Sequence, residues 1–175
     1  MNQPPSPSIH FLPQSEAALS LLAAGEAQAA GAALGVQITP YLVAEDTRWL
    51  WQRRLEQVRA DPTSLDWIAR VAVDTQRGMP VGIAGFHGPP DAAGMVEVGY
   101  RVTPLQRRRG YARAMLRALL ERAAREPAVH TVRASIRPDN AASLATIAPF
   151  GFVQVGEQMD EIDGLELVFE VPARP

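Results

Sequence analysis

The chain has 175 residues, of which 47% are hydrophobic and 21% charged, and its formal net charge is −2. This composition excludes a largely disordered chain and predicts one globular domain with a sizeable core. Residues 1–8 contain three prolines and no charged side chain, so we expect a flexible leader there and a single domain over residues 9–175. The leader lacks the basic and apolar regions of a signal peptide.

Cysteine and lysine are both missing from the sequence. The lack of cysteine excludes disulfides, thiolate metal sites and a cysteine nucleophile, and it fits a cytoplasmic location. All 17 basic residues are arginine, so no lysine can form a Schiff base. A catalytic base must therefore be Glu, Asp, His or water. With only three scattered histidines, we expect no metal site.

The first half of the chain is predicted to be mainly helical. A short strand is expected at residues 9–13, and Ser15 is a candidate N-cap for a helix or helix pair over residues 17–34. The polar and glycine residues of that segment argue against a membrane span, so we expect it to pack on a sheet. A further helix is expected over residues 44–59, with Trp49, Leu50, Leu55 and Val58 buried and Arg53 and Arg54 outside.

The second half is predicted to contain most of the sheet. Alternating hydrophobic residues predict a three-strand meander over residues 67–74, 81–87 and 95–103. A strongly periodic helix follows and ends at Pro127, and the next strand, residues 130–137, should run parallel to the strand before the helix. A short helix over residues 140–148 and a hairpin formed by residues 152–159 and 165–171 complete the expected order.

The most informative stretch joins the strand ending near residue 103 to the periodic helix. A helix N-terminus offers unpaired backbone N–H groups and the positive end of the helix dipole, which together favour an anion. Gly110 allows a ligand to approach the backbone closely, and Arg107, Arg108 and Arg109 add positive charge. This stretch therefore predicts a pyrophosphate site.

Three motifs together resemble the GNAT superfamily, the acetyl-CoA-dependent N-acetyltransferases. Residues 107–112 match its [QR]-x-x-G-x-[GA] pyrophosphate turn, residues 138–143 match its Asn-bearing start of the fourth helix, and residues 150–152 match its Gly-Phe entry to the sixth strand. Residues 97–100 look especially like the subgroup of ribosomal-protein N-terminal acetyltransferases. The resemblance implies an α+β, three-layer fold of the acyl-CoA N-acyltransferase type. Its mixed, mostly antiparallel sheet would have a central βαβ unit and splayed strands.

The resemblance also implies acetyl-CoA as co-substrate and a primary amine as acceptor, either a peptide α-amino group or a small molecule. The acetyl-CoA site is expected at Tyr100, Arg101, Val102, Arg107, Arg108, Arg109, Gly110, Tyr111, Ala112, Arg113, Asn140 and Ser143. On the alternative interpretation, the arginines form only a solvated face and Asn140 is only a helix cap.

Glu97 is the candidate general base. Two-residue alternation places it on the same side of its strand as Gly99 and Arg101, from where it could act through water. Alternatively, Glu97 forms an ion pair with Arg101 or another surface arginine. Many members of the superfamily carry a tyrosine that protonates the departing thiolate, but this chain has Ile147 at that position. Water, Thr146 or Ser143 would then supply the proton, or the thiolate would leave unassisted.

Acceptor contacts are less well indicated. The three tryptophans could line a cleft, although core positions are favoured, and the acids of the last turn could attract an amine, although turns are commonly acidic. His87 is either an accessory base or a structural residue. These residues are Trp49, Trp51, Trp67, Asp160, Glu161, Asp163 and His87.

Two other functions compete with acetyl transfer. The chain could be a non-catalytic module that senses acyl-CoA, or residues 101–137, which hold ten of the arginines, could bind nucleic acid. The slightly negative net charge and the lack of interleaved aromatic residues argue against a nucleic-acid partner. We expect no membrane partner, and the terminal hairpin or an exposed strand edge could support a homodimer.

Overall fold

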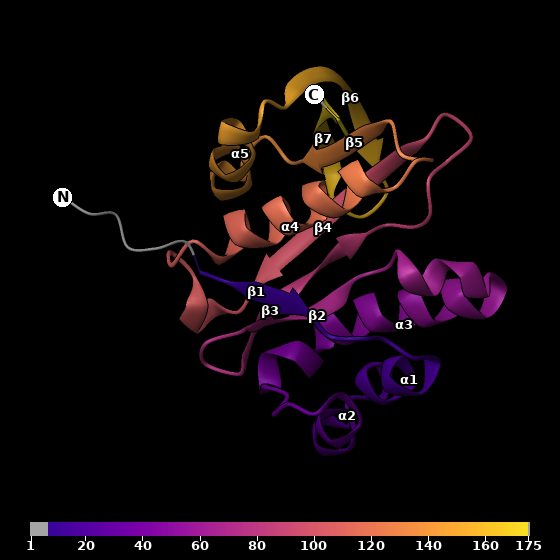
Figure 1. Cartoon of the computed structure of the whole chain (residues 1–175), viewed down its shortest axis with the longest axis vertical. Helices are drawn as coiled ribbons and strands as arrows, with labels where there is room; N and C mark the ends of the chain where they lie inside the picture. The colour runs from indigo at the N-terminus through magenta and orange to yellow at the C-terminus, as the bar shows by residue number, and fades with distance from the viewer. Residues whose placement is uncertain (1–6, 175) are drawn as a thin grey trace.

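The computed structural model describes residues 7–174, in which one seven-stranded sheet lies between two layers of helices (Figure 1). The strands are β1 (Ile9–Phe11), β2 (Arg70–Asp74), β3 (Met79–Phe86), β4 (Met95–Val102), β5 (Thr131–Ile136), β6 (Val153–Asp160) and β7 (Gly164–Pro172). The helices are α1 (Glu16–Ala24), α2 (Ala27–Leu34), α3 (Glu45–Ala60), α4 (Tyr111–Arg125) and α5 (Ala141–Ile147). Short 3₁₀ turns are η1 (Pro40–Val43), η2 (Pro62–Asp66), η3 (Pro104–Gln106) and η4 (Ala148–Phe150).

The strand order is β1-β2-β3-β4-β5-β7-β6, and β4 with β5 is the one parallel pair within the described residues. The expected α+β fold with a mixed, mostly antiparallel sheet and a central βαβ unit is thus confirmed. The connection from β4 through α4 to β5 is the predicted crossover.

Alternation along the strands produces two cores, one on each face of the sheet. Val71, Val73 and Ile83 face the layer of α1, α2 and α3, where leucines of α1 and Trp51 of α3 pack on them. The opposite face packs against α4 and α5 through the apolar stripe of α4, and this stripe comprises Tyr111, Met115, Leu116, Leu119 and Ala123. The periodicity expected for this helix is therefore confirmed.

The segment after β1 forms two helices because a glycine ends the first of them. Ser15 is the N-cap of α1, as predicted, and its Oγ accepts a hydrogen bond from the N–H of Ala18. Gly25 adopts a left-handed conformation, with φ +81°, and its N–H bonds back to the carbonyls of Leu21 and Leu22. The chain then turns into α2.

The buried face of α3 differs from the prediction. Trp49, expected in the core, is 46% exposed, whereas Trp51 is fully buried and its Nε1 donates a hydrogen bond to the Leu42 carbonyl. Arg54, expected outside, is only 7% exposed, while Arg53 lies outside and its guanidinium stacks over Trp49. The stripe that includes Trp51, Leu55 and Val58 also includes position 54, so an arginine enters the core.

Several boundaries also differ slightly. The strand expected from residue 67 begins at Arg70, because η2 holds the chain in a 3₁₀ turn up to Asp66. The expected leader falls mostly outside the described residues, but the carbonyl of Ser8 accepts a hydrogen bond from the Thr75 N–H. Within residues 7–174, no helix combines the length and apolarity needed to cross a membrane. The outer strand β6 exposes Val153, Val155 and Met159, and a homodimer stays a prediction.

β4 and β5 separate after a short paired region. Met95, Val96 and Glu97 pair with Thr131, Val132 and Arg133, and the pairing stops there. β4 continues along β3 to Val102, and β5 continues along β7 to Ile136. The expected splay is confirmed, and it begins beside Glu97.

Candidate active site

The splay leaves one side of β4 without a strand partner. His87 bonds to Glu97 and Thr103 bonds to Val81 through their backbones. The backbone N–H and C=O groups of the odd-numbered residues of β4 therefore point toward β3. Antiparallel pairing alternates, so the N–H and C=O groups of Tyr100 and Val102 point the other way, toward the opening. In the described part of the chain, no strand pairs with them there. The N–H groups of both residues and the carbonyl of Tyr100 can therefore bond an extended ligand, whereas the Val102 carbonyl accepts a hydrogen bond from Arg107 Nε at 3.3 Å.

The turn before α4 bends in a way that exposes backbone N–H groups. Gly110 has φ +83° and Arg108 has φ +60°, and Arg108 is the one non-glycine residue within residues 7–174 with positive φ. Such a conformation costs a non-glycine residue about 1–3 kcal/mol and is concentrated at ligand sites. No side chain caps the start of α4, so its first N–H groups remain available to an anion.

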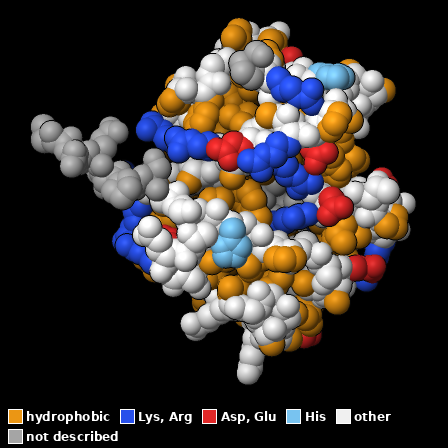
Figure 2. All heavy atoms as spheres, in the orientation of Figure 1, with side chains coloured by type: hydrophobic (Ala, Val, Ile, Leu, Met, Phe, Trp, Pro, Cys, Tyr) orange, Lys and Arg blue, Asp and Glu red, His pale blue; other side chains and the backbone are white. Residues whose placement is uncertain are grey.

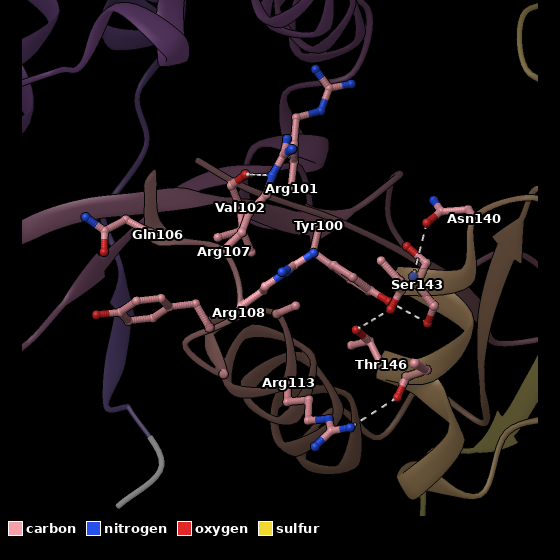
Figure 3. Close-up of a pocket in the computed structure, with 15 residues that line it drawn as sticks. Tyr100, Arg101, Val102, Gln106, Arg107, Arg108, Arg113, Asn140, Ser143 and Thr146 are labelled. Carbon is pink, nitrogen blue, oxygen red and sulfur yellow. Dashed lines mark hydrogen bonds between the residues drawn. The ribbon is translucent and has the colours of Figure 1, made fainter. Parts of the chain in front are cut away.

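A cleft of about 790 Å³ connects this turn with the open edge of β4 and with α5 (Figure 3). Every residue predicted to bind acetyl-CoA lines it except Arg109. Sequence analysis missed three further lining residues, Gln106, Ala142 and Ala145, and named a fourth, Thr146, only as a possible proton donor. Ala142, Ala145 and Thr146 lie on one face of α5, as their three- and four-residue spacing requires.

The lining side chains point in different directions. Arg101 turns away from the cleft and its Nη1 bonds to Asp46 on α3, at 2.9 Å, so this residue contributes no charge to the cleft (Figure 3). Tyr111 also points away, and its hydroxyl donates to the buried Asp74 Oδ2 at 2.5 Å. That bond ties the first residue of α4 to the end of β2. The pKa of Asp74 is lowered by the Tyr111 hydroxyl and by the N–H groups of Arg77 and Gln76.

On the opposite wall, Asn140 is the N-cap of α5. Its Oδ1 accepts a hydrogen bond from the Ser143 N–H at 3.1 Å, which confirms the capping role and leaves Nδ2 to serve as a donor to a ligand. The ring of Tyr100 reaches across from β4, and its hydroxyl lies 3.5 Å from the Ser143 carbonyl oxygen. Burial raises the pKa of Tyr100, so its hydroxyl keeps its proton at neutral pH.

Ile147 is 3% exposed and packs in the core, so it lies away from any site of proton transfer. The hydroxyl of Thr146 lies nearer the cleft but donates to the Ala142 carbonyl at 2.8 Å. Of the two tyrosines that line the cleft, Tyr100 is the one whose hydroxyl contacts α5, although its backbone belongs to β4.

A second cavity, of about 290 Å³, adjoins the first cleft and extends between β4 and β5 where these strands separate. It shares Tyr100, Asn140 and Ser143 with the first cavity. The rest of its wall comes from His87, from β4, from β5 and the following Arg137, and from the β6–β7 hairpin, including Asp163 and Glu166. Two connected cavities with one common wall can hold a large donor and a smaller acceptor next to each other.

Glu97 lies beneath this second cavity but lines neither one. Its Oε1 is 3.8 Å from His87 Nδ1, and its side chain is about one-fifth exposed. The alternative pairing with Arg101 is wrong, because Arg101 bonds to Asp46. No ion pair within the described residues joins Glu97 to an arginine.

The remaining candidates have mainly structural roles. Trp51 lies in the core, Trp67 packs against Phe86 and carries the Arg122 guanidinium over its ring, and no tryptophan lines either cavity. Asp160 Oδ1 accepts from the N–H groups of Ile162 and Asp163, as expected for a turn. Figure 2 shows that the arginines at the level of α4 alternate with acidic side chains, and Arg125 lies 4.0 Å from Glu121. A continuous basic surface for nucleic acid is therefore not seen on this face.

Comparisons with known proteins agree with this geometry. A family model described as an acetyltransferase (GNAT) domain matches residues 17–153. The chain is 34% identical over 73 residues to an uncharacterized N-acetyltransferase, YjdG, of Bacillus subtilis (strain 168), over 42% of this chain and 44% of that protein. The match thus spans less than half of that relative.

Solved structures share the fold. RimJ from Mycobacterium smegmatis, in complex with CoA-disulfide, has a TM-score of 0.65 at 19% identity, over 94% of this chain and 82% of that one. A putative GNAT-family acetyltransferase from Bordetella pertussis has a TM-score of 0.61 at 24% identity, over 95% of each chain. With a family model covering most of its length, the chain belongs to the GNAT acetyltransferases.

Proposed function

We propose that this protein transfers the acetyl group of acetyl-CoA to a primary amine by direct attack in a ternary complex. One observation carries the proposal: a large cleft that ends at an anion-binding turn meets a smaller cavity at the unpaired edge of β4. The larger cleft suits the donor, and the smaller one suits the acceptor. Tyr100 lies in the wall that they share.

The donor would bind along the open edge of β4. Its pyrophosphate would take the N–H groups of the turn from Arg108 to Arg113, assisted by the guanidinium groups of Arg107, Arg108 and Arg113. The backbone of Tyr100 and Val102 would hold the pantetheine arm, with Asn140 Nδ2 opposite. Arg109 does not line the cleft and would affect the pyrophosphate only as a more distant positive charge.

The chemistry needs one proton removed and one supplied. The amine nitrogen attacks the acetyl carbonyl carbon, a C–N bond forms, and the C–S bond of the thioester breaks. The proton lost by the nitrogen passes to an intermediate group that Glu97 supports, since Glu97 itself lines neither cavity. The thiolate takes a proton from the Tyr100 hydroxyl, which solvent then replaces.

The acceptor is proposed to be a peptide α-amino group or a small amine. An α-amino group has a pKa of about 7.7–8.0 and is partly neutral at physiological pH, whereas a lysine amine near 10.4 needs a stronger base. Asp163 and Glu166 line the acceptor cavity together with Arg137, whose guanidinium pairs with Asp139 at 3.1 Å, so the two acids are left to favour an amine over an anionic group. Burial and the neighbouring carboxylates raise the pKa of Glu166, against a hydrogen bond from Gln158.

A screen of amines and peptides, with detection of the free CoA thiol, tests the proposal. The protein has no cysteine, so a thiol reagent reports only CoA. We expect acetyl-CoA to be consumed with at least one acceptor and the acetylated product to be seen by mass spectrometry. Tight CoA binding without turnover on the whole panel would instead identify a non-catalytic sensing module.

Substituting Glu97→Gln tests whether this carboxylate contributes to removal of the proton from the amine. Because general-base catalysis contributes roughly 10²–10⁴-fold, kcat should fall by about 100-fold while the CoA Kd changes little. The loss should be greatest for acceptors of high pKa. Glu56→Gln, an exposed position on α3 that lines neither cavity, is the matched control. An equal, small effect across all acceptors would remove Glu97 from the mechanism.

A further inference from the structure

The imidazole of His87 occupies the position between Glu97 and the acceptor cavity. His87 follows β3 directly, and its Nδ1 lies 3.8 Å from Glu97 Oε1. Its Nε2 lies over Gly99, only 2.9 Å from where a Cβ of that residue would be. About half of the His87 side chain is exposed, and it lines the second cavity. One ring nitrogen thus faces the carboxylate while the other lies over the first residues of the splay.

The backbone of His87 is held in place from two sides. Its N–H donates to the Glu97 carbonyl at 2.8 Å, and its own carbonyl accepts from Arg54 Nη1 at 3.0 Å and from Gln57 Nε2 at 2.8 Å. Arg54 is buried, so this hydrogen bond comes from a charged group in the protein interior rather than from a surface side chain. These hydrogen bonds fix the position of the His87 backbone and thereby limit the groups that its imidazole can contact.

Charged groups face His87 from each element packed against it. Glu97 comes from β4, Arg54 and Arg53 come from α3, and Asp160 comes from β6. Partial burial of the half-exposed ring, together with the two arginines, lowers the pKa of His87, although the two carboxylates oppose the shift. The imidazole is therefore neutral at physiological pH. In a neutral ring one nitrogen donates and the other accepts, so with Nδ1–H toward Glu97 the free lone pair is on Nε2.

We propose that His87 is the intermediate group: its Nε2 accepts the proton from the acceptor amine as the C–N bond forms, and Glu97 stabilises the resulting imidazolium through Nδ1–H. This inference rests on the proposed function. The proton leaves the nitrogen of the tetrahedral adduct, resides on Nε2, and passes to solvent through the exposed part of the ring after the thiolate has left. Glu97 stays ionised throughout and acts as a positioning residue.

The 3.8 Å separation is compatible with this role. Hydrogen bonds between catalytic groups are often long without substrate and shorten in the reacting complex. A carboxylate that lines neither cavity gains access to the substrate only through a neighbour, and His87 is the titratable group between them. Gly99 permits the arrangement because any larger residue would displace the ring.

Two substitutions act on the ring without touching the donor cleft. His87→Gln keeps a polar side chain but cannot take up a proton, and kcat should fall by about 100-fold with an unchanged CoA Kd. Gly99→Ala would put a methyl group against Nε2 on a backbone that accepts alanine, and it should lower kcat in the same direction. In the double variant the two losses should not multiply. His10→Gln, an exposed histidine on β1, is the control and should behave as wild type.

The imidazole pKa, followed by NMR, provides a readout that a structural role would not move. The chain has three histidines, so His87 can be assigned by its loss in His87→Gln. Glu97→Gln removes a negative neighbour and should lower the His87 pKa, whereas Arg53→Gln removes a positive neighbour and should raise it. The NMR signals of the other two histidines serve as internal controls in both variants.

The outcomes separate the inference from the proposed function. If wild type acetylates an amine and His87→Gln retains the same kcat, the role of His87 is overturned while the proposed function stands. An unchanged His87 pKa in both charge variants would likewise overturn its coupling to Glu97. If wild type binds CoA but acetylates no acceptor, both are overturned together.

Discussion

Replacing Gly110 by glutamate tests whether the turn before α4 binds the donor. Gly110 has φ +83° and precedes a helix whose first N–H groups have no side-chain cap. A Cβ at this position would lie 3.3 Å from Pro7 Cδ. Glu therefore introduces backbone strain, bulk and a negative charge where we place the pyrophosphate.

The size of the effect can be worked out from these features. The left-handed conformation costs a non-glycine residue about 1–2 kcal/mol, which lowers stability but leaves the fold intact. A carboxylate roughly 5 Å from a phosphate charge is repelled by about 1–3 kcal/mol, depending on solvent exposure. This repulsion corresponds to CoA binding that is weaker by about 5- to 150-fold. Steric exclusion of the pyrophosphate adds to the loss.

Titration calorimetry with CoA measures the affinity, and thermal unfolding measures the strain. Gly110→Ala should show the strain with a smaller loss of affinity. Gly35→Glu is the matched control, because Gly35 also has a left-handed φ, +70°, but lies at the end of α2 with nothing within 4 Å of its Cβ position. It should lose stability and bind CoA normally. Wild-type affinity in folded Gly110→Glu would refute the placement of the pyrophosphate.

Two other predictions concern the tyrosines at the donor cleft. Tyr111→Phe removes a hydrogen bond to an ionised carboxylate and should lower the free energy of unfolding by about 1.5–3 kcal/mol. Because the pKa of Asp74 is lowered in the folded state, this contribution is complete above about pH 4 and is lost as the pH falls through the lowered value, so urea unfolding of the two proteins should converge in acid. Tyr100→Phe should lower kcat by about 10- to 100-fold with an unchanged CoA Kd, measured by thiol release and calorimetry, if its hydroxyl protonates the thiolate. Wild-type turnover in this variant would show that the Tyr100 hydroxyl does not protonate the thiolate.

Most residues that line the larger cleft could be predicted to lie together because they are close in the sequence. The end of β4, the turn and the start of α4 form one continuous segment, residues 100–113, in which local conformation sets the backbone positions. Gly110 and the arginines indicate the turn, and the apolar stripe of α4 indicates the helix, each from residues that are neighbours in the sequence. Asn140 entered the predicted site through the resemblance to the superfamily, and only its capping role follows from the three residues after it.

The interior of α3 could not be predicted from the same kind of pattern. Trp49 and Trp51 are both apolar but point in different directions, since two residues correspond to about 200° around a helix. Composition favours burying both, and only the packing of α3 against the sheet selects Trp51. Arg54 is buried for a long-range reason: its guanidinium bonds to the carbonyl of His87, 33 residues further along the chain.

Local sequence patterns thus determine the elements of this protein, their order and the anion-binding turn, because helix periodicity, strand alternation and caps act over a few residues. The acceptor side depends on long-range contacts. The splay of β4 from β5, the approach of Tyr100 to α5, and the meeting of His87, Glu97 and Asp163 join segments that are far apart in the chain. Such contacts arise only when the sheet is assembled, so residue type and spacing alone cannot reveal them.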